Sequence, residues 1–332
     1  MSLRDDLNRC RYDGSDRGHY ESWFQRGNHP SRPLAFWIRY TIFVPAGRRS
    51  EAVGELWAIV FDGERSRIVA VKEAYPLAQC DVSPERPQLR IAGATLDLDG
   101  ARLEGGARHA GHDVRWVLRY EGDEPPLLLL PPNLYDAALP KAKALVGTPL
   151  ARFEGRLEVD GEPLPIDGWV GSQNHNWGRQ HTDQYAWGQV AGFDDDPTAF
   201  LELSTARLKM GPLWTPFLTP LVLRQGGHEH VLTGLGQALR AHGRFRPFEW
   251  RFSSHGPDVR IEGKITAAAR DVVVLRYDNP PGGHKLCLNT KLAACELLVE
   301  RAGEKPLRLE TEHRAAFEIL GDTAPEGMSP VA

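Results

Sequence analysis

The stretch GSQNHNWGRQHTDQYAWGQV, residues 171–190, gathers side chains that can donate, accept or transfer protons and contains hardly any aliphatic ones. Successive side chains of an extended strand point to opposite sides, so Asn174 and Asn176 share one side and His175 and Trp177 the other. An imidazole can act as acid or base near neutral pH, which makes His175 a candidate catalytic residue. Asn174 and Trp177 are candidate substrate-binding residues.

The cost of burying polar groups limits how this stretch can be used. An interior amide costs about 1–3 kcal/mol for each group left unpaired, so the cluster is either fully hydrogen bonded or beside a wet pocket. Tyr185 and Trp187 combine an apolar ring with a hydrogen-bonding group and are further candidate binding residues. The stretch is therefore a reactive or ligand-binding site, or else a self-satisfied polar cluster that holds two barrels in register.

Two glutamates stand among apolar or aromatic neighbours elsewhere in the chain. If Glu202, in the segment FLELS, points inward, burial raises its pKa and keeps it protonated as a usable acid; if it points outward, it is a surface charge. Glu21, in YESWFQR, lies near Trp23 and either lines a lumen or faces solvent. We take His175 and Glu202 as candidate catalytic residues, with Glu21 and Trp23 as candidate binding residues.

Arg39 is the last candidate binding residue, and it lies in the alternating segment FWIRYTIF. One face of this segment carries Tyr40, and the other carries Trp37 and Arg39. A barrel lined by aromatic rings and a few polar groups encloses a cavity, in which case Arg39 would contact a ligand. The alternative is that Trp37 packs in a core and Arg39 extends to water.

Sequence motifs of nucleotide-dependent enzymes, serine hydrolases and zinc proteases are absent: no GxGxxG opens a helix, and GxxxxGK[ST], GxSxG and HExxH do not occur. The four cysteines are widely spread without a CxxC pair. His109 and His112, like His228 and His230, stand among glycines and charged residues, as is typical of solvated loops. We therefore predict no metal site and no other cofactor.

Charge and hydropathy exclude several classes of partner. A net charge of −4 with a pI near 6.3 gives no case for nucleic acid or for an anionic membrane, both of which favour a basic surface. No apolar run approaches the ~20 residues of a membrane-spanning helix, and the first residues lack the apolar segment of a secretory signal. We expect a cytoplasmic protein without a transmembrane segment, compatible with peripheral membrane contact; its oligomeric state stays open.

The elements that must position these residues are mostly strands. Short runs rich in β-branched and aromatic residues recur between turn signals, on the order of sixteen to twenty of them, and the only helical candidate is YDAALPKAKALV at 135–146. Such a pattern predicts an all-β fold, and long antiparallel meanders tend to close into barrels. A chain of 332 residues accommodates two barrels, which we place at 1–165 and 166–332, with the boundary uncertain by about 20 residues.

Three segments resemble a known superfamily: HYESWFQRGNHPSRPLAFWIRYTIF at 19–43, GWVGSQNHNWGRQHTDQYAWGQV at 168–190, and YDNPPGGHKLCLNTKLAACEL at 277–297. They are similar to the AttH-like, hydroxyneurosporene synthase (carotenoid 1,2-hydratase) and tocopherol cyclase proteins, over nearly the whole chain. The resemblance implies two consecutive lipocalin-like barrels with the His/Trp motif near their junction.

The resemblance also implies chemistry. In the hydratase branch, an isoprenoid double bond is protonated and water captures the carbocation, which aromatic rings can stabilise. His175 and Trp177 match that branch's His-x-Trp pair, while Phe200 and Glu202 stand where it has Tyr-x-Asp. The loss of a hydroxyl and the longer acid put carotenoid hydration itself in doubt. Other relatives shape a substrate for a pericyclic reaction, and others bind hydrophobic molecules.

Three function classes follow. The first is a cofactor-independent enzyme, of hydratase or cyclase type, that acts on a hydrophobic isoprenoid or polyketide-like substrate by protonation or by templating its conformation. The alternative is a non-catalytic carrier or sensor of a hydrophobic, lipid-like small molecule. The third is a sugar-binding or scaffolding β protein, which would expose Trp23, Trp177 or Trp187 for stacking.

Overall fold

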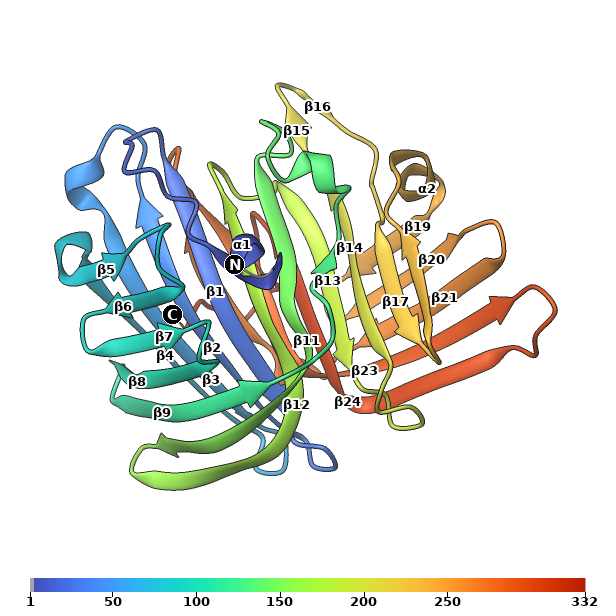
Figure 1. The fold of residues 1–332 in the computed structure, drawn as a ribbon, viewed down its shortest axis with the longest axis horizontal. Helices are drawn as coiled ribbons and strands as arrows, with labels where there is room; N and C mark the ends of the chain where they lie inside the picture. The colour runs from blue at the N-terminus through green and yellow to red at the C-terminus, as the bar shows by residue number, and fades with distance from the viewer. Residues whose placement is uncertain (1–2, 332) are drawn as a thin grey trace.

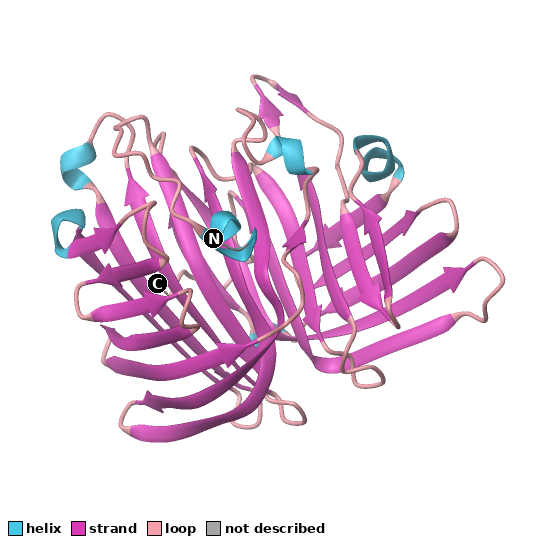
Figure 2. Cartoon of the chain, viewed as in Figure 1, coloured by secondary structure: helices cyan, strands magenta, loops and turns pink. Residues whose placement is uncertain are grey.

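The computed structural model describes residues 3–331, and nearly all of its regular structure is β-strand. The strands form two large antiparallel sheets that lie side by side along the long axis of the molecule (Figures 1 and 2). Each sheet curls around a hydrophobic core of its own. The predicted all-β architecture of two lipocalin-like barrels is confirmed.

The first sheet contains twelve strands in the order β4-β3-β2-β1-β12-β11-β9-β8-β7-β6-β5, with β10 paired to β11. It curls so that β4 lies against β8 and β9. Its strands are β1 (His19–Asn28), β2 (Leu34–Val44), β3 (Val53–Asp62), β4 (Arg67–Pro76), β5 (Cys80–Val82), β6 (Gln88–Ile91), β7 (Ala94–Asp97), β8 (Arg102–His109), β9 (His112–Glu121), β10 (Leu127–Leu128), β11 (Ala142–Val159) and β12 (Glu162–Gly178).

The second sheet contains ten strands in the order β18-β17-β14-β13-β24-β23-β21-β20-β19, with β22 paired to β23. Its strands are β13 (Gln184–Ala191), β14 (Phe200–Arg207), β17 (Leu221–Gln225), β18 (His228–Leu232), β19 (His242–Arg246), β20 (Glu249–His255), β21 (Val259–Thr266), β22 (Val273–Asp278), β23 (His284–Arg301) and β24 (Leu307–Gly321).

Few elements lie outside these sheets. A separate hairpin joins β15 (Lys209–Met210) to β16 (Leu213–Trp214), and two short helices are described, α1 (Leu3–Asn8) and α2 (Leu235–Arg240). None of the described helices is long and apolar enough to cross a membrane. All four cysteines are free thiols.

The side chains of strand β2 alternate between the first core and the contact between the barrels. Phe36 and Tyr40 point into the first core, where the Tyr40 hydroxyl accepts a hydrogen bond of 2.7 Å from the Trp116 indole. The intervening Trp37 belongs instead to a hydrophobic cluster shared with strands β22 and β23 of the second sheet. Both faces of β2 are therefore buried, one in a barrel and one between barrels.

Large side chains pack in the interior of each barrel and Arg39 lies outside both interiors, which corrects the expectation of an aromatic-lined lumen around Arg39. Phe36 and Phe153 pack edge to face in the first barrel, and Trp250 lies against Phe317 in the second. Arg39 meets neither of the two expectations, because it lies between the barrels and is almost fully buried rather than extended to water.

The transition from the first sheet to the second falls at residues 179–183, between β12 and β13. The two sheets meet along β1, β2 and β3 on one side and β13, β23 and β24 on the other. The segment 135–146 is not a helix: residues 135–141 are irregular, and β11 begins at Ala142. Leu145 and Val146 pair with His175 and Asn174, so the contacts available in the sheet outweigh the weak helical pattern.

A glycine allows β1 and β12 to approach closely where both faces of the pair are buried. A Cβ atom on Gly171 would lie 1.8 Å from the carbonyl oxygen of Arg26. We predict that Gly171→Ala lowers the free energy of unfolding by about 3 kcal/mol, because backbone must shift to relieve the overlap. The matched control is Gly93→Ala, where a Cβ would meet no atom within 4 Å. Urea denaturation measures both variants, and an equal, small effect would contradict this account of the strand contact.

Candidate functional site

The alternation predicted for residues 174–177 is present, and it divides the candidate residues between two places. Strand β12 pairs with β1 so that His175 lies opposite Trp23, and Trp177 opposite Glu21. These four side chains lie on the face of the sheet that the N-terminal segment covers. Asn174 points the other way, towards the second sheet.

Glu21 and His175 form a buried hydrogen-bonded contact on the first face. His175 Nε2 lies 2.8 Å from Glu21 Oε1, and neither side chain is exposed. The other ring nitrogen, Nδ1, lies 3.0 Å from the carbonyl oxygen of Leu7 in α1. The Trp23 ring stacks on the imidazole, with the ring centroids 4.7 Å apart.

The carboxylate of Glu21 is also an anchor for the N-terminal segment. It accepts backbone hydrogen bonds from Arg11 at 2.7 Å and Tyr12 at 3.0 Å, and His19 Nε2 lies 2.9 Å from Oε2. Burial acts to raise the pKa of Glu21, but hydrogen bonds from His175 and His19 outweigh it and lower the pKa to about 2. Glu21 therefore stays ionised at all ordinary pH values.

Further contacts fix helix α1 over this end of the first barrel. The Trp23 indole donates to the carbonyl oxygen of Asn8 at 2.9 Å, and the Asn8 and Gln173 amides exchange two hydrogen bonds. The Trp177 ring packs against Arg11, whose guanidinium carbon is 5.1 Å from the ring centroid. We call the set Asn8, Glu21, Trp23, Gln173 and His175 the N-terminal latch, since each member holds the segment before β1.

Glu202 lies on the opposite side of the β1–β12 pair, between the two barrels. Its neighbours on β14, Leu201 and Leu203, face the second core, so the period of two turns Glu202 towards the first sheet. The Trp187 indole donates to its Oε1 at 2.7 Å, and the Gln189 amide donates to its Oε2 at 2.9 Å. The sequence left open whether Glu202 points inward or to solvent, and the structure shows its side chain buried.

Gln189 connects Glu202 to the first sheet. Its amide also donates to Asn174 Oδ1 at 2.9 Å, while its own oxygen accepts from Arg26 Nε and from the Ser172 hydroxyl, both at 2.6 Å. Arg26 Nη1 donates in turn to Asn28 at 2.6 Å. We call the set Arg26, Ser172, Asn174, Trp187, Gln189 and Glu202 the Glu202 network.

The pKa of Glu202 shifts in the opposite direction to that of Glu21. Loss of solvent raises the pKa of Glu202 to about 7, although the hydrogen bonds from Trp187 and Gln189 and the charge of Arg26 act to lower it. A carboxyl group with such a pKa is protonated in a substantial fraction of molecules at neutral pH. It can therefore donate a proton, whereas Glu21 cannot.

A second buried charge pair lies next to this network. Lys291 Nζ is 2.9 Å from Glu318 Oε1 and donates to Asn289 Oδ1 at 2.6 Å. The ammonium group also lies over the rings of Trp37 and Trp187, 5.5 and 5.7 Å from their centroids. Burial lowers the pKa of Lys291, while Glu318 favours its charged form.

Aromatic rings surround Arg39 in the same interface. Its guanidinium carbon lies 4.7 Å from the Tyr277 centroid and 5.9 Å from that of Trp57, and its Nη2 donates to Ser22 at 2.6 Å. A cavity of about 10 Å³ adjoins Arg39, enough for about one water molecule. Arg39 Nε has no partner within the described residues, so a water there would satisfy it.

The nine candidate residues thus form two groups. Glu21, Trp23, His175 and Trp177 belong to or pack beside the N-terminal latch, and Arg39, Asn174, Tyr185, Trp187 and Glu202 lie between the barrels. The structure does not bring His175 and Glu202 together, because Asn174 rather than His175 faces Glu202.

Sequence reasoning missed Arg26, Gln189, Lys291 and Glu318. Lys291 and Glu318 carry the signal that singled out Glu202, a charge inside an otherwise apolar strand segment, as in TKLAAC and AAFEIL. Applied uniformly, that signal would have found both of them. Arg26 has no comparable mark, because QRGN reads as a polar strand end.

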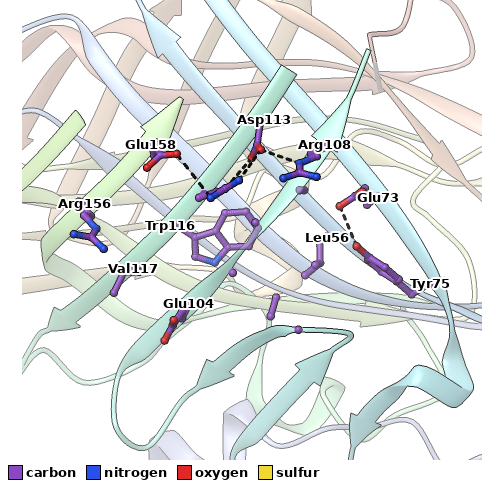
Figure 3. A pocket seen from close by; sticks show the side chains of 16 residues that line it. Leu56, Glu73, Tyr75, Glu104, Arg108, Asp113, Trp116, Val117, Arg156 and Glu158 are labelled. Atoms are coloured by element: carbon purple, nitrogen blue, oxygen red, sulfur yellow. Dashed lines mark hydrogen bonds and ion pairs between the residues drawn. The ribbon is translucent and has the colours of Figure 1, made fainter. Parts of the chain in front are cut away.

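A larger cleft lies on the first barrel, of about 530 Å³, and Figure 3 shows its lining. Trp116 and Leu56 form its apolar floor, while its rim carries charges, several of them paired. Arg108 and Arg115, for example, both contact Asp113. Within residues 3–331, no group of three or more His, Cys, Asp or Glu side chains is arranged to hold a metal ion.

Comparison with known proteins identifies the fold. No family profile and no curated protein sequence matches the chain. A protein of Nitrosomonas europaea assigned as AttH matches with a TM-score of 0.64 and 13% identity, over 98% of this chain and 97% of its own. Kievitone hydratase of Nectria haematococca matches with a TM-score of 0.58 and 12% identity, over 94% and 93% of the two chains.

A third solved structure is CghA with Sch210972, which matches with a TM-score of 0.54 and 10% identity, over 93% of this chain and 89% of its own. Identities this low show a shared fold. The resemblance to the AttH-like double lipocalin-like proteins, expected from three sequence segments, is confirmed at that level.

We predict that Glu21→Gln loosens the N-terminal segment and lowers the free energy of unfolding by about 3 kcal/mol at neutral pH, as the fall of its pKa from 4.5 to about 2 implies. A depressed carboxyl pKa stabilises the fold above the unfolded value, so this contribution is lost as pH falls from about 4.5 to 2. Urea denaturation and amide exchange at Arg11 and Tyr12 measure it. Glu64→Gln, at an exposed ion pair with Arg32, is the control and should change little. Equal amide exchange rates at Arg11 and Tyr12 in wild type and in Glu21→Gln would contradict the anchoring role of Glu21.

Glu202→Gln should have the opposite pH dependence. Because the folded protein holds the Glu202 proton up to about pH 7, wild type loses stability as pH rises from about 4.5 to 7, by about 3 kcal/mol in total. The glutamine variant lacks this loss, so it gains on wild type over that range. Denaturation curves at about pH 5 and about pH 8 measure the difference. Parallel pH profiles of the two proteins would contradict the raised pKa.

Proposed function

We propose that the face between the barrels is the active site of a cofactor-independent enzyme of hydratase or cyclase type, with Glu202 as its acid. The observation that carries the proposal is a buried carboxyl group with a pKa of about 7, held by Trp187 and Gln189. A general acid works best when its pKa is near the working pH. The shared fold with kievitone hydratase supports the same reaction class.

Protonation of a substrate by Glu202 would leave a positive charge on the substrate next to the carboxylate that forms, and the two opposite charges attract. Arg39 and Lys291 already lie over four aromatic rings, those of Trp37, Trp57, Trp187 and Tyr277. Aromatic faces attract positive charge, more strongly where water is excluded. Transfer of the Glu202 proton to a double bond would leave a carboxylate and form a carbocation beside Trp187, and the carboxylate would regain a proton when water adds to the cation or a neighbouring C–H proton is lost. An apolar isoprenoid or polyketide-like chain is the substrate class that fits.

We place substrate entry on the side of Tyr185 and Trp187, because these two aromatic residues of β13 are only partly buried. The cavity of about 10 Å³ beside Arg39 holds about one water and is not lined by Glu202 or Trp187, so a substrate must displace aromatic side chains between the sheets to reach the acid. We propose that the N-terminal latch, His175 included, positions β1 and β12 behind the site instead of reacting with the substrate. Glycan stacking is disfavoured, since Trp23 and Trp177 are buried.

The proposal predicts a specific pattern of activity. Incubation with acyclic terpenoids and linear polyenes, followed by mass spectrometry of products, should reveal turnover that Glu202→Gln lowers by about 100-fold or more. Activity should fall as pH rises above about 7, because the acid then loses its proton. His175→Gln should retain activity in protein whose folding is verified by circular dichroism.

Glu104→Gln is the matched control, because Glu104 lines the cleft on the first barrel rather than the interface. Loss of activity in Glu104→Gln with retention in Glu202→Gln would show that the active site is the cleft on the first barrel and not the face between the barrels. Recovery of a bound apolar molecule that stays unchanged over time and yields no product would favour the non-catalytic carrier over the enzyme.

A further inference from the structure

Large apolar side chains gather at one end of the second barrel. Met210, Leu213 and Trp214 belong to the β15–β16 hairpin, and Leu235 and Leu239 belong to α2; we call these five residues the docking edge. Each exposes between 39% and 70% of its surface, and together they are five of the nine large apolar side chains exposed in the described part of the chain. An apolar patch of this kind on a soluble fold marks an interaction surface.

The hairpin and α2 belong to the same end of the barrel. The segment after β16 runs past the helix, where the Thr219 amide donates to the carbonyl oxygen of Ala238 at 2.9 Å. Phe217 of that segment packs edge to face against Phe245, with centroids 5.7 Å apart. Figure 1 shows both elements at the upper edge, with the hairpin projecting from the body.

The turn of the hairpin presents its apolar residues at the tip. Gly211, with a positive φ of 62°, and Pro212 make the turn, so that Met210 pairs directly with Leu213 and Lys209 with Trp214. The base is fixed by hydrogen bonds between Leu208 and Thr215. The hairpin tip therefore projects from a base that hydrogen bonds hold in place.

The charge around the docking edge is positive, although the whole protein carries −4. Arg207, Lys209 and Arg240 lie on or beside the hairpin and α2, whereas Arg224 and Arg246 are paired with Glu229 and Glu249. Arg207 lies over the Trp214 ring, 4.3 Å from its centroid, and Lys209 lies at 5.9 Å. Asp183, whose Oδ2 accepts from the Lys209 amide, is the acid at the hairpin base, where Lys285 lies 4.0 Å away.

We propose that the docking edge binds the surface of an anionic lipid membrane, with Met210, Leu213 and Trp214 inserted among the lipids. Tryptophan and aliphatic residues enter the interface of a bilayer, and flanking cations add attraction to anionic head groups. A projecting tip suits insertion better than flat packing against a protein. A second copy is disfavoured because two such edges would bring like charges together.

The test uses full-length protein and sedimentation with vesicles of phosphatidylcholine or of an equal mixture of phosphatidylcholine and phosphatidylglycerol. Wild type should sediment with the mixed vesicles and less with phosphatidylcholine, and added salt should release it. Leu213→Asp should weaken binding about tenfold or more, since an apolar anchor is replaced by a charge that anionic lipid repels. Lys209→Gln should weaken binding to the mixed vesicles about fivefold and leave phosphatidylcholine unaffected.

Val117→Asp is the matched control, an exposed apolar residue on β9 of the first barrel that should sediment like wild type. Wild type that stays in solution with both vesicles, or a Leu213→Asp variant that binds as well as wild type, overturns the proposal. Concentration-dependent dimerisation that Leu213→Asp abolishes also overturns it, in favour of a second copy. Glu202→Gln should bind vesicles like wild type, so this result is independent of the proposed reaction.

Discussion

The whole site depends on one geometric constraint: where β1 pairs with residues 171–178 of β12, successive side chains enter different environments, and both environments are buried. On one face the chain builds the N-terminal latch; on the other it builds the Glu202 network. A surface sheet would expose one of these faces to water and leave its polar groups satisfied at no cost. Here most polar groups on the two faces find a partner within the fold, the Gln25 amide and Asn176 Oδ1 being exceptions among the described residues, and the hydrogen bonds therefore extend from β1 through β12 to β13 and β14.

The two glutamates show what this constraint does to chemistry. Both lie in strands and both are buried, yet the backbone amides and imidazoles around Glu21 hold its charge, whereas Glu202 receives fewer donors and is left with a raised pKa. The difference follows from what faces each carboxyl group. Glu21 meets a chain segment with free amides, at Arg11 and Tyr12, and Glu202 meets side chains of a second sheet.

Much of the fold was predictable from sequence, because strand alternation and turn residues are local signals. The segment 36–44 and the hairpin of 56–61 with 67–71 are strands as expected, and the raised pKa of an inward Glu202 followed from its apolar neighbours. Alternation also separated Asn174 from His175. It could not say which side met which neighbour, since both sides of β12 are buried, so His175 and Glu202 were grouped although Asn174 separates them. Net charge hid the local excess of cations near Trp214, because acids elsewhere in the chain offset it.

The central claim is that Glu202 is a proton donor placed between two barrels, and its ionisation can be observed directly. A ¹³C NMR titration of carboxyl resonances, with the Glu202 signal assigned by its absence in Glu202→Gln, gives the pKa without any substrate. We predict a midpoint near pH 7, far above the ordinary value of 4.5 for a glutamate side chain. A midpoint near the ordinary 4.5 would show an ionised carboxylate at neutral pH and would contradict the acid role on which the proposed chemistry rests.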